Sequence, residues 1–139
     1  MKVVIIDGQG GKMGQMIIER IKSTGIRCEL ACVGTNSIAT SAMLKAGADA
    51  GATGENPVVA ASRDAGVIIG PIGIIAADSL LGEITPAMAV AVGQSKAKKL
   101  LLPVNLCNNI IVGTGSLPMA KLITEAVDEL AKICLSAKA

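Results

Sequence analysis

The chain has 139 residues, of which 51% are hydrophobic and 17% are charged, and its formal net charge is +2. This length and composition indicate one folded domain over residues 1–139 with a full apolar core, not a disordered chain. The small charge and the absence of Phe, Tyr and Trp argue against nucleic-acid binding, which uses basic patches and stacking platforms. Because the chain also lacks His, only Asp, Glu, Lys and Cys can exchange protons.

The sequence pattern predicts a cytoplasmic protein without a membrane partner. No apolar run reaches the roughly 18 residues that a membrane span needs, and the first apolar run is too short for a signal peptide. We expect the 4 cysteines to be free thiols. Cys28 and Cys32 lie too far apart on one predicted strand for a disulfide, and the cysteine spacing fits no zinc site, so we expect no metal.

Apolar runs and helical repeats alternate along the chain. The first unit is a strand over 2–7, a glycine loop over 8–14, a helix over about 12–24 and a strand over 28–34. The later elements are a helix over 38–46, a glycine-rich loop over 47–57, a strand or helical turn over 58–61, a strand over 67–70, helices over 74–81 and 86–94, strands over 99–104 and 110–112, and a helix over 117–134. This order predicts an α/β, three-layer Rossmann-like fold, with a mostly parallel sheet and helices on both faces.

The loop after the first strand is the main candidate site. Gly8, Gly11 and Gly14 form a G-x-x-G-x-x-G pattern, and Gly8 and Gly10 supply the first half of the G-x-G-x-x-G dinucleotide pattern. Such a turn lets the backbone approach a phosphate and presents helix N–H groups to it. We expect a nucleotide or another phosphorylated ligand here, and the alternative is a tight turn without a ligand. The candidate binding residues are Gly8, Gln9, Gly10, Gly11, Lys12, Met13 and Gly14.

The end of the second predicted strand bears on which nucleotide is bound. In a dinucleotide fold an Asp or Glu at this place holds the ribose, but here Thr35 and Asn36 follow the strand and no carboxylate or Arg is beside them. Their hydroxyl and amide groups could bind a ribose, or Asn36 or Ser37 only caps the next helix. NAD, NADP, a mononucleotide and other phosphorylated ligands therefore all stay open.

Two further loops, over 70–73 and 105–109, should lie at the same edge of a parallel sheet. If the strands over 2–7 and 67–70 flank the point where the strand order reverses, Gly70 and Pro71 face the first glycine loop across one crevice. The sequence Gly-Pro-Ile-Gly is also that of a plain turn.

Three side chains are candidates for chemistry. Cys107 is predicted in the crevice as a nucleophile or redox centre, but no neighbouring His or Lys is evident to activate it, and an incidental thiol is the alternative. Glu83 and Glu55 are candidate proton acceptors, and the alternative is that both are exposed or capping carboxylates.

Six segments together resemble a family of small bacterial proteins that is described as a domain of unknown function. The segments are 7–11, 34–36, 39–48, 51–56, 68–74 and 81–89. This resemblance covers nearly the whole chain and implies a Rossmann-like domain without a known activity. Residues 3–18 are also similar to the nucleotide loop of dihydrodipicolinate reductase, Gly-x-x-Gly-Arg-Met-Gly, with Lys12 in place of Arg. That similarity implies an NAD(P)-type cofactor but not that reaction, because the second domain and catalytic His have no counterpart.

Three functions follow as hypotheses. The first is a nucleotide- or dinucleotide-binding protein and, if an enzyme, an NAD(P)-dependent reductase whose substrate half comes from the 47–57 loop, a symmetry mate or another protein. The second is a non-catalytic sensor or subunit that forms a homo-oligomer, favoured by the missing His and Tyr and by the apolar stretch over 66–93. The third is an enzyme for a small phosphorylated metabolite that uses Glu83 or Cys107.

Overall fold

A computed structural model describes residues 1–104 and 108–138, and in them five parallel strands form one sheet with the order β3-β2-β1-β4-β5. The strands are β1 (Lys2–Asp7), β2 (Glu29–Gly34), β3 (Ala50–Thr53), β4 (Val67–Pro71) and β5 (Lys98–Leu102). The helices are α1 (Lys12–Thr24), α2 (Ser37–Lys45), α3 (Glu55–Asp64), α4 (Pro86–Gln94), α5 (Met119–Lys138) and a short 3-10 helix, η1 (Ile72–Ile75).

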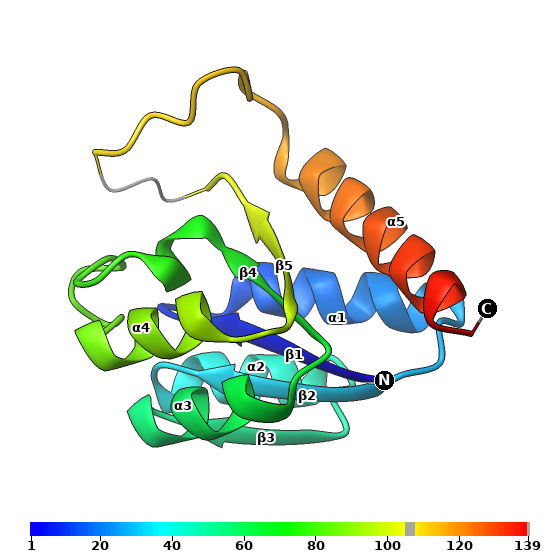
Figure 1. Cartoon of the computed structure of the whole chain (residues 1–139), viewed down its shortest axis with the longest axis horizontal. Coiled ribbons are helices and arrows are strands. Elements are labelled where there is room, and N and C mark those ends of the chain that lie inside the picture. Colours follow the sequence, from blue (N-terminus) through cyan, green and yellow to red (C-terminus); the bar gives the residue numbers. More distant parts are fainter. Residues whose placement is uncertain (105–107, 139) are drawn as a thin grey trace.

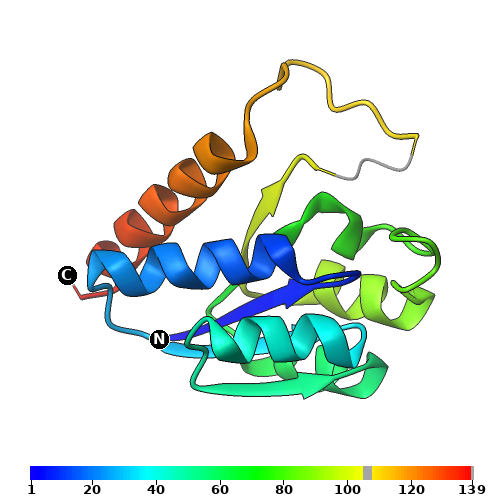
Figure 2. The same cartoon turned by 180° about the vertical axis from the view of Figure 1, so that it is seen from behind.

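Helices cover both faces of the sheet (Figures 1 and 2). Helices α1, α2 and α5 pack on one face, and α3 and α4 pack on the other. The face changes where the chain leaves β3 and returns past β2 and β1 to β4, because parallel crossovers are right-handed. This confirms the predicted Rossmann-like α/β fold.

The central strand β1 is apolar on both sides because both of its faces are covered. Val3 and Ile5 contribute to the core under α1 and α5, and Val4 and Ile6 contribute to the core under α4. All four side chains are fully buried. Such a continuous apolar run is the sequence signature of a central parallel strand.

The strand order reverses between β1 and β4, which meets the condition stated for the strands over 2–7 and 67–70. β1 lies between β2 and β4, and the register pairs Ile5 with Cys32 on one side and with Ile69 on the other. The carboxyl ends of these strands therefore meet at the edge where open α/β sheets bind ligands.

The predicted loop over 47–57 is wrong. Residues 50–53 form the edge strand β3, and α3 begins at Glu55, so the undecided segment 58–61 is helical. The local sequence hides β3 because it is Ala-Gly-Ala-Thr and its residues are exposed, and pairing with β2 sets its conformation. A Cβ at Gly51 would lie 2.9 Å from both Cys32 Sγ and Leu44 Cδ2, so a larger residue here would make these side chains shift.

The predicted helix over 74–81 is also wrong. After η1 the chain makes irregular turns, with positive φ at Asp78 (65°), Leu80 (54°) and Leu81 (55°). Leu80 and Ile84 are both buried in the core under α4, and the Asp78 N–H donates to the Ile84 carbonyl at 2.7 Å. Tertiary packing therefore overrides the helical pattern.

The predicted strand over 110–112 is absent from the described residues. Ile110 and Val112 are exposed, and the Thr114 N–H donates to the Ile111 carbonyl to close a turn. The last helix begins at Met119, two positions later than predicted. Residues 105–107, which include Cys107, lie outside the described part of the chain.

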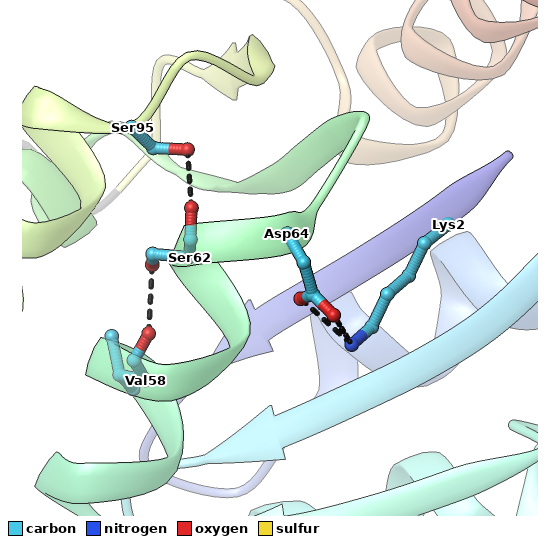
Figure 3. Close-up of polar contacts among 5 residues, drawn as sticks. All are labelled: Lys2, Val58, Ser62, Asp64 and Ser95. Atoms are coloured by element: carbon cyan, nitrogen blue, oxygen red, sulfur yellow. Dashed lines mark hydrogen bonds and ion pairs between the residues drawn. The ribbon is translucent and has the colours of Figure 1, made fainter.

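Polar contacts tie α3 to its neighbours at the edge where the strands begin (Figure 3). The Lys2 Nζ contacts both oxygens of Asp64 at 2.9 and 3.0 Å, which joins β1 to the end of α3. The Ser95 hydroxyl donates to the Ser62 carbonyl at 2.6 Å, which joins the end of α4 to α3. This edge lies opposite the candidate site.

Candidate functional site

A buried carboxylate shapes the glycine loop. Asp7 ends β1 and is only 5% exposed; its Oδ1 accepts the Gly8 N–H and its Oδ2 accepts the Gly14 N–H, both at 2.8 Å. Burial raises the pKa of Asp7. The two hydrogen bonds lower it, but by less than burial raises it. The sequence analysis missed this residue, although an Asp between an apolar strand and a glycine is a visible signal. Its carboxylate holds the two ends of the loop together.

The glycines of the loop have different reasons to be glycine. Gly11 caps α1 with φ 73°, and a Cβ there would lie 2.7 Å from the Ala39 Cα on α2. At Gly14 a Cβ would lie 2.9 Å from the Met43 Cγ, also on α2. Close packing of α1 on α2 therefore explains both. Only Gly10 differs, because a Cβ there would meet no atom within 4 Å.

Glu83 reaches the loop from the irregular segment after η1. Both of its oxygens accept the Gln9 N–H at 3.1 Å, and its Oε1 also accepts the Thr35 hydroxyl at 2.7 Å and the Asn36 Nδ2 at 2.6 Å. Burial alone would raise the pKa of Glu83, but these hydrogen bonds outweigh it and hold the pKa below its ordinary value. Glu83 is therefore an ionised acceptor at the ends of β1 and β2.

This carboxylate corrects the sequence analysis, which found none at the end of the second strand. Glu83 lies 48 residues after Thr35 and 47 after Asn36, and no local pattern links them. The fold itself brings the segment after β4 across β1. An acidic residue therefore stands close to the end of β2 without being part of it.

Asn36 caps α2, which is one of the two alternatives that the sequence left open, and it also bonds to the glycine loop. Its Oδ1 accepts the Ala39 N–H at 2.9 Å and so caps α2, while its Nδ2 donates to the Gln9 carbonyl at 2.9 Å and to Glu83. The N–H and carbonyl of Gln9 are thus both held, which fixes its unusual φ of 51°.

The start of α1 presents unused donors. Among the described residues, the backbone N–H groups of Gly10, Lys12 and Met13 have no acceptor, and Lys12 forms no ion pair. The Met13 side chain is buried in the core and does not block them. Free N–H groups at a helix N-terminus, together with a lysine, favour an anion.

Gly70 and Pro71, which the sequence predicts to face the glycine loop, are buried at the end of β4. A Cβ at Gly70 would collide with the Ile6 carbonyl oxygen, so strand packing explains this glycine. The segment after β4 does meet the glycine loop, but through Leu80 and Glu83, which lie beside Gly8.

Of the other candidates for chemistry, Cys107 lies outside the described residues, and Glu55 contacts the cap of α4. Glu55 accepts the Thr85 hydroxyl at 2.6 Å and so links the start of α3 to the cap of α4. Of the cysteines within the described residues, Cys28, Cys32 and Cys134 are free thiols. Burial raises the pKa of Cys28, and raises that of Cys32 to about 11, so neither thiol is activated.

Two searches within residues 1–104 and 108–138 were negative. No cluster of three or more Cys, Asp or Glu side chains is arranged to hold a metal ion there. No helix of that part is both long enough and apolar enough to cross a membrane.

Comparison with known proteins gives one match. Residues 2–135 match the family model described as "Domain of unknown function (DUF3842)". No curated protein and no solved structure matches the chain, so the similarity of residues 3–18 to dihydrodipicolinate reductase has no further support.

Proposed function

Since the chain belongs to the DUF3842 family, a domain of unknown function, its role must be argued from its own residues, and we propose that it binds a nucleotide with an unmodified ribose diol, such as NAD. One observation carries the proposal: Glu83 stands between Gln9 and Thr35, at the ends of β1 and β2. In nucleotide-binding Rossmann folds an acidic group near the end of the second strand accepts the ribose hydroxyls.

Glu83 has acceptor capacity left for a ligand. A carboxylate offers about four acceptor positions. Its Oε1 accepts three hydrogen bonds, from Gln9, Thr35 and Asn36, whereas its Oε2 shares only the Gln9 N–H. The remaining position on Oε2 suits one hydroxyl donor of a ribose diol.

The phosphates would bind at the start of α1. The free N–H groups of Gly10, Lys12 and Met13 are the donors, and the Lys12 ammonium adds a positive charge. Because Gly10 fronts open space, a phosphate can approach the backbone there. Ribose and phosphate groups would then occupy adjacent parts of one crevice.

The charge of Glu83 also favours one form of dinucleotide. An ionised carboxylate repels the 2′-phosphate of NADP, and the low pKa of Glu83 keeps it ionised at neutral pH. The same low pKa makes Glu83 a weak general base. The site therefore supports binding of NAD over NADP, and it does not support Glu83 as the base of a metabolite enzyme.

Titration calorimetry against NAD, NADP, ATP, S-adenosylmethionine and coenzyme A tests the proposal. We expect NAD to bind at least about tenfold more tightly than NADP, and Glu83→Gln to reduce that preference. Absence of binding by every nucleotide at millimolar concentration would overturn the proposal.

Gly10 offers a matched pair of variants for placing the ligand. Gly10→Ala adds a methyl group at a backbone angle that alanine adopts, so it should fold, and because the methyl group occupies the space where the phosphate would approach, it should lose part of the affinity. Gly10→Asp puts a negative charge beside the phosphate donors and should weaken binding by at least about tenfold. Equal affinity of the two variants would place the ligand elsewhere.

A further inference from the structure

The chain forms an apolar arm between β5 and α5. Within residues 108–118 there is no Asp, Glu, Lys or Arg, and the segment projects beyond the rest of the molecule in both views (Figures 1 and 2). Ile110 and Val112 are 87% and 92% exposed. An uncharged segment with two almost fully exposed β-branched side chains is typical of an interaction surface.

The same chain has an open sheet edge. β5 is the outermost strand, and its Lys98 N–H donates inward to the Gly66 carbonyl at 3.0 Å. Because successive residues of a strand face opposite sides, the backbone groups of Lys99 and Leu101 point outward. Among the described residues their N–H groups have no acceptor outside β5. A strand could therefore add to this edge.

A groove runs along that open edge. It has a volume of about 250 Å³ and lies between β5 and α5. Leu101, Leu122 and Ala126 give it apolar walls, and Glu125 and Glu129 stand at its rim. An uncharged extended segment with small branched side chains suits such a groove better than a charged one does.

We propose that two copies of the chain form a two-fold dimer. The arm of one copy, at Ile110–Val112, docks along the β5 edge in the groove of the second copy, and the arm of the second copy docks in the groove of the first. The chain carries both complementary parts, an exposed β-branched segment and an open strand edge. Its own arm does not fill its own groove, because residues 109–111 line a separate cavity of about 240 Å³ against η1 and Ser79. Reciprocal exchange between two copies would cover both surfaces at once.

Sedimentation of the purified chain tests this dimer independently of any nucleotide. We expect twice the monomer mass of 13.9 kDa at micromolar concentration. Val112→Lys should give a monomer with an unchanged melting temperature, because this side chain is exposed in the monomer. Ile38→Lys is the control, since Ile38 is 70% exposed on α2, and it should remain a dimer. A monomeric wild type, or a dimeric Val112→Lys, would overturn the proposal.

A mixing experiment tests the pairing of arm with groove. Ala126→Lys places a long charged side chain on the groove wall and should also give a monomer, with circular dichroism checking the fold. A mixture of this variant with Val112→Lys retains one intact arm and one intact groove, so heterodimers should form. If each variant is a monomer and the mixture remains monomeric, the arm does not dock in this groove.

Discussion

The two halves of the sheet end very differently at the same edge. At β1 and β2 the loops are short, and Asp7, Asn36 and Glu83 bind the backbone groups that the turns expose. Beyond β4 the chain makes turns with positive φ. Beyond β5 it forms a projecting arm with exposed apolar side chains. Under the two proposals, the polar groups at the ends of β1 and β2 would recognise a small ligand, whereas the apolar groups beyond β5 would contact a protein. Ligand binding and association would then use separate parts of the fold.

The largest expected effect concerns how tightly the first half is packed. Gly11→Ala forces an L-residue to φ 73° and drives its Cβ to 2.7 Å from the Ala39 Cα. We expect a loss of about 3 kcal/mol in the free energy of unfolding, measured with urea. Gly10→Ala, one residue earlier and in open space, should change it by less than about 0.5 kcal/mol. Equal losses would mean that α1 does not pack on α2 as described.

Asp7→Ala probes the bracing of the glycine loop. Removal of the carboxylate leaves the buried N–H groups of Gly8 and Gly14 without acceptors. We expect a loss of about 2–3 kcal/mol in urea unfolding. The protection of both amides against hydrogen exchange should fall by the free energy of the lost hydrogen bonds. The protection of the α5 amides should fall only as far as the global stability does. Retained protection of the two amides would contradict the role of Asp7.

Glu83→Gln should have a smaller, pH-dependent effect. The amide replaces a charged acceptor of the Gln9, Thr35 and Asn36 groups, and we expect a loss of about 1–2 kcal/mol at neutral pH. Because the folded pKa lies below the ordinary value of 4.5, this stabilisation is present above pH 4.5 and is lost as the pH falls through the folded value. Urea unfolding of both proteins at several pH values measures it. A difference that grows on acidification would contradict the sign.

The smallest effect is a gain in the second half of the sheet. Leu81 is 94% exposed with φ 55°, so Leu81→Gly relieves backbone strain without loss of packing. We expect the free energy of unfolding to rise by up to about 1 kcal/mol. Leu117→Gly is the control, because Leu117 is exposed without a positive φ, and glycine there should lower stability slightly. The melting temperature should therefore rise for Leu81→Gly and fall slightly for Leu117→Gly.

Local signals allowed three helix ends to be predicted. Gly25 ends α1 at φ 73°, Asn36 caps α2, and Thr85 with Pro86 starts α4 at the expected residue. These caps act within a few residues, so a single sequence displays them.

The remainder depends on contacts between distant residues. β3 has no apolar pattern of its own and exists because it pairs with β2. The turns over 76–84 follow from the burial of Leu80 and Ile84, which cancels a helical repeat. Glu83 reaches Gln9 because β4 pairs with β1 and so brings the segment after β4 beside the glycine loop. The position of the glycine loop could thus be predicted from the sequence, but Glu83 as its acidic partner could not.

The hydrogen bonds to both backbone groups of Gln9 have a thermodynamic consequence for ligand binding. Its N–H is bound by Glu83 and its carbonyl by Asn36, so the Gln9 backbone is already held before any ligand arrives. A nucleotide that binds there has no loop to immobilise, and preorganisation of this kind limits the entropy lost on association. The heat capacity of binding should then reflect the apolar surface that the ligand itself covers, without a contribution from folding of the loop.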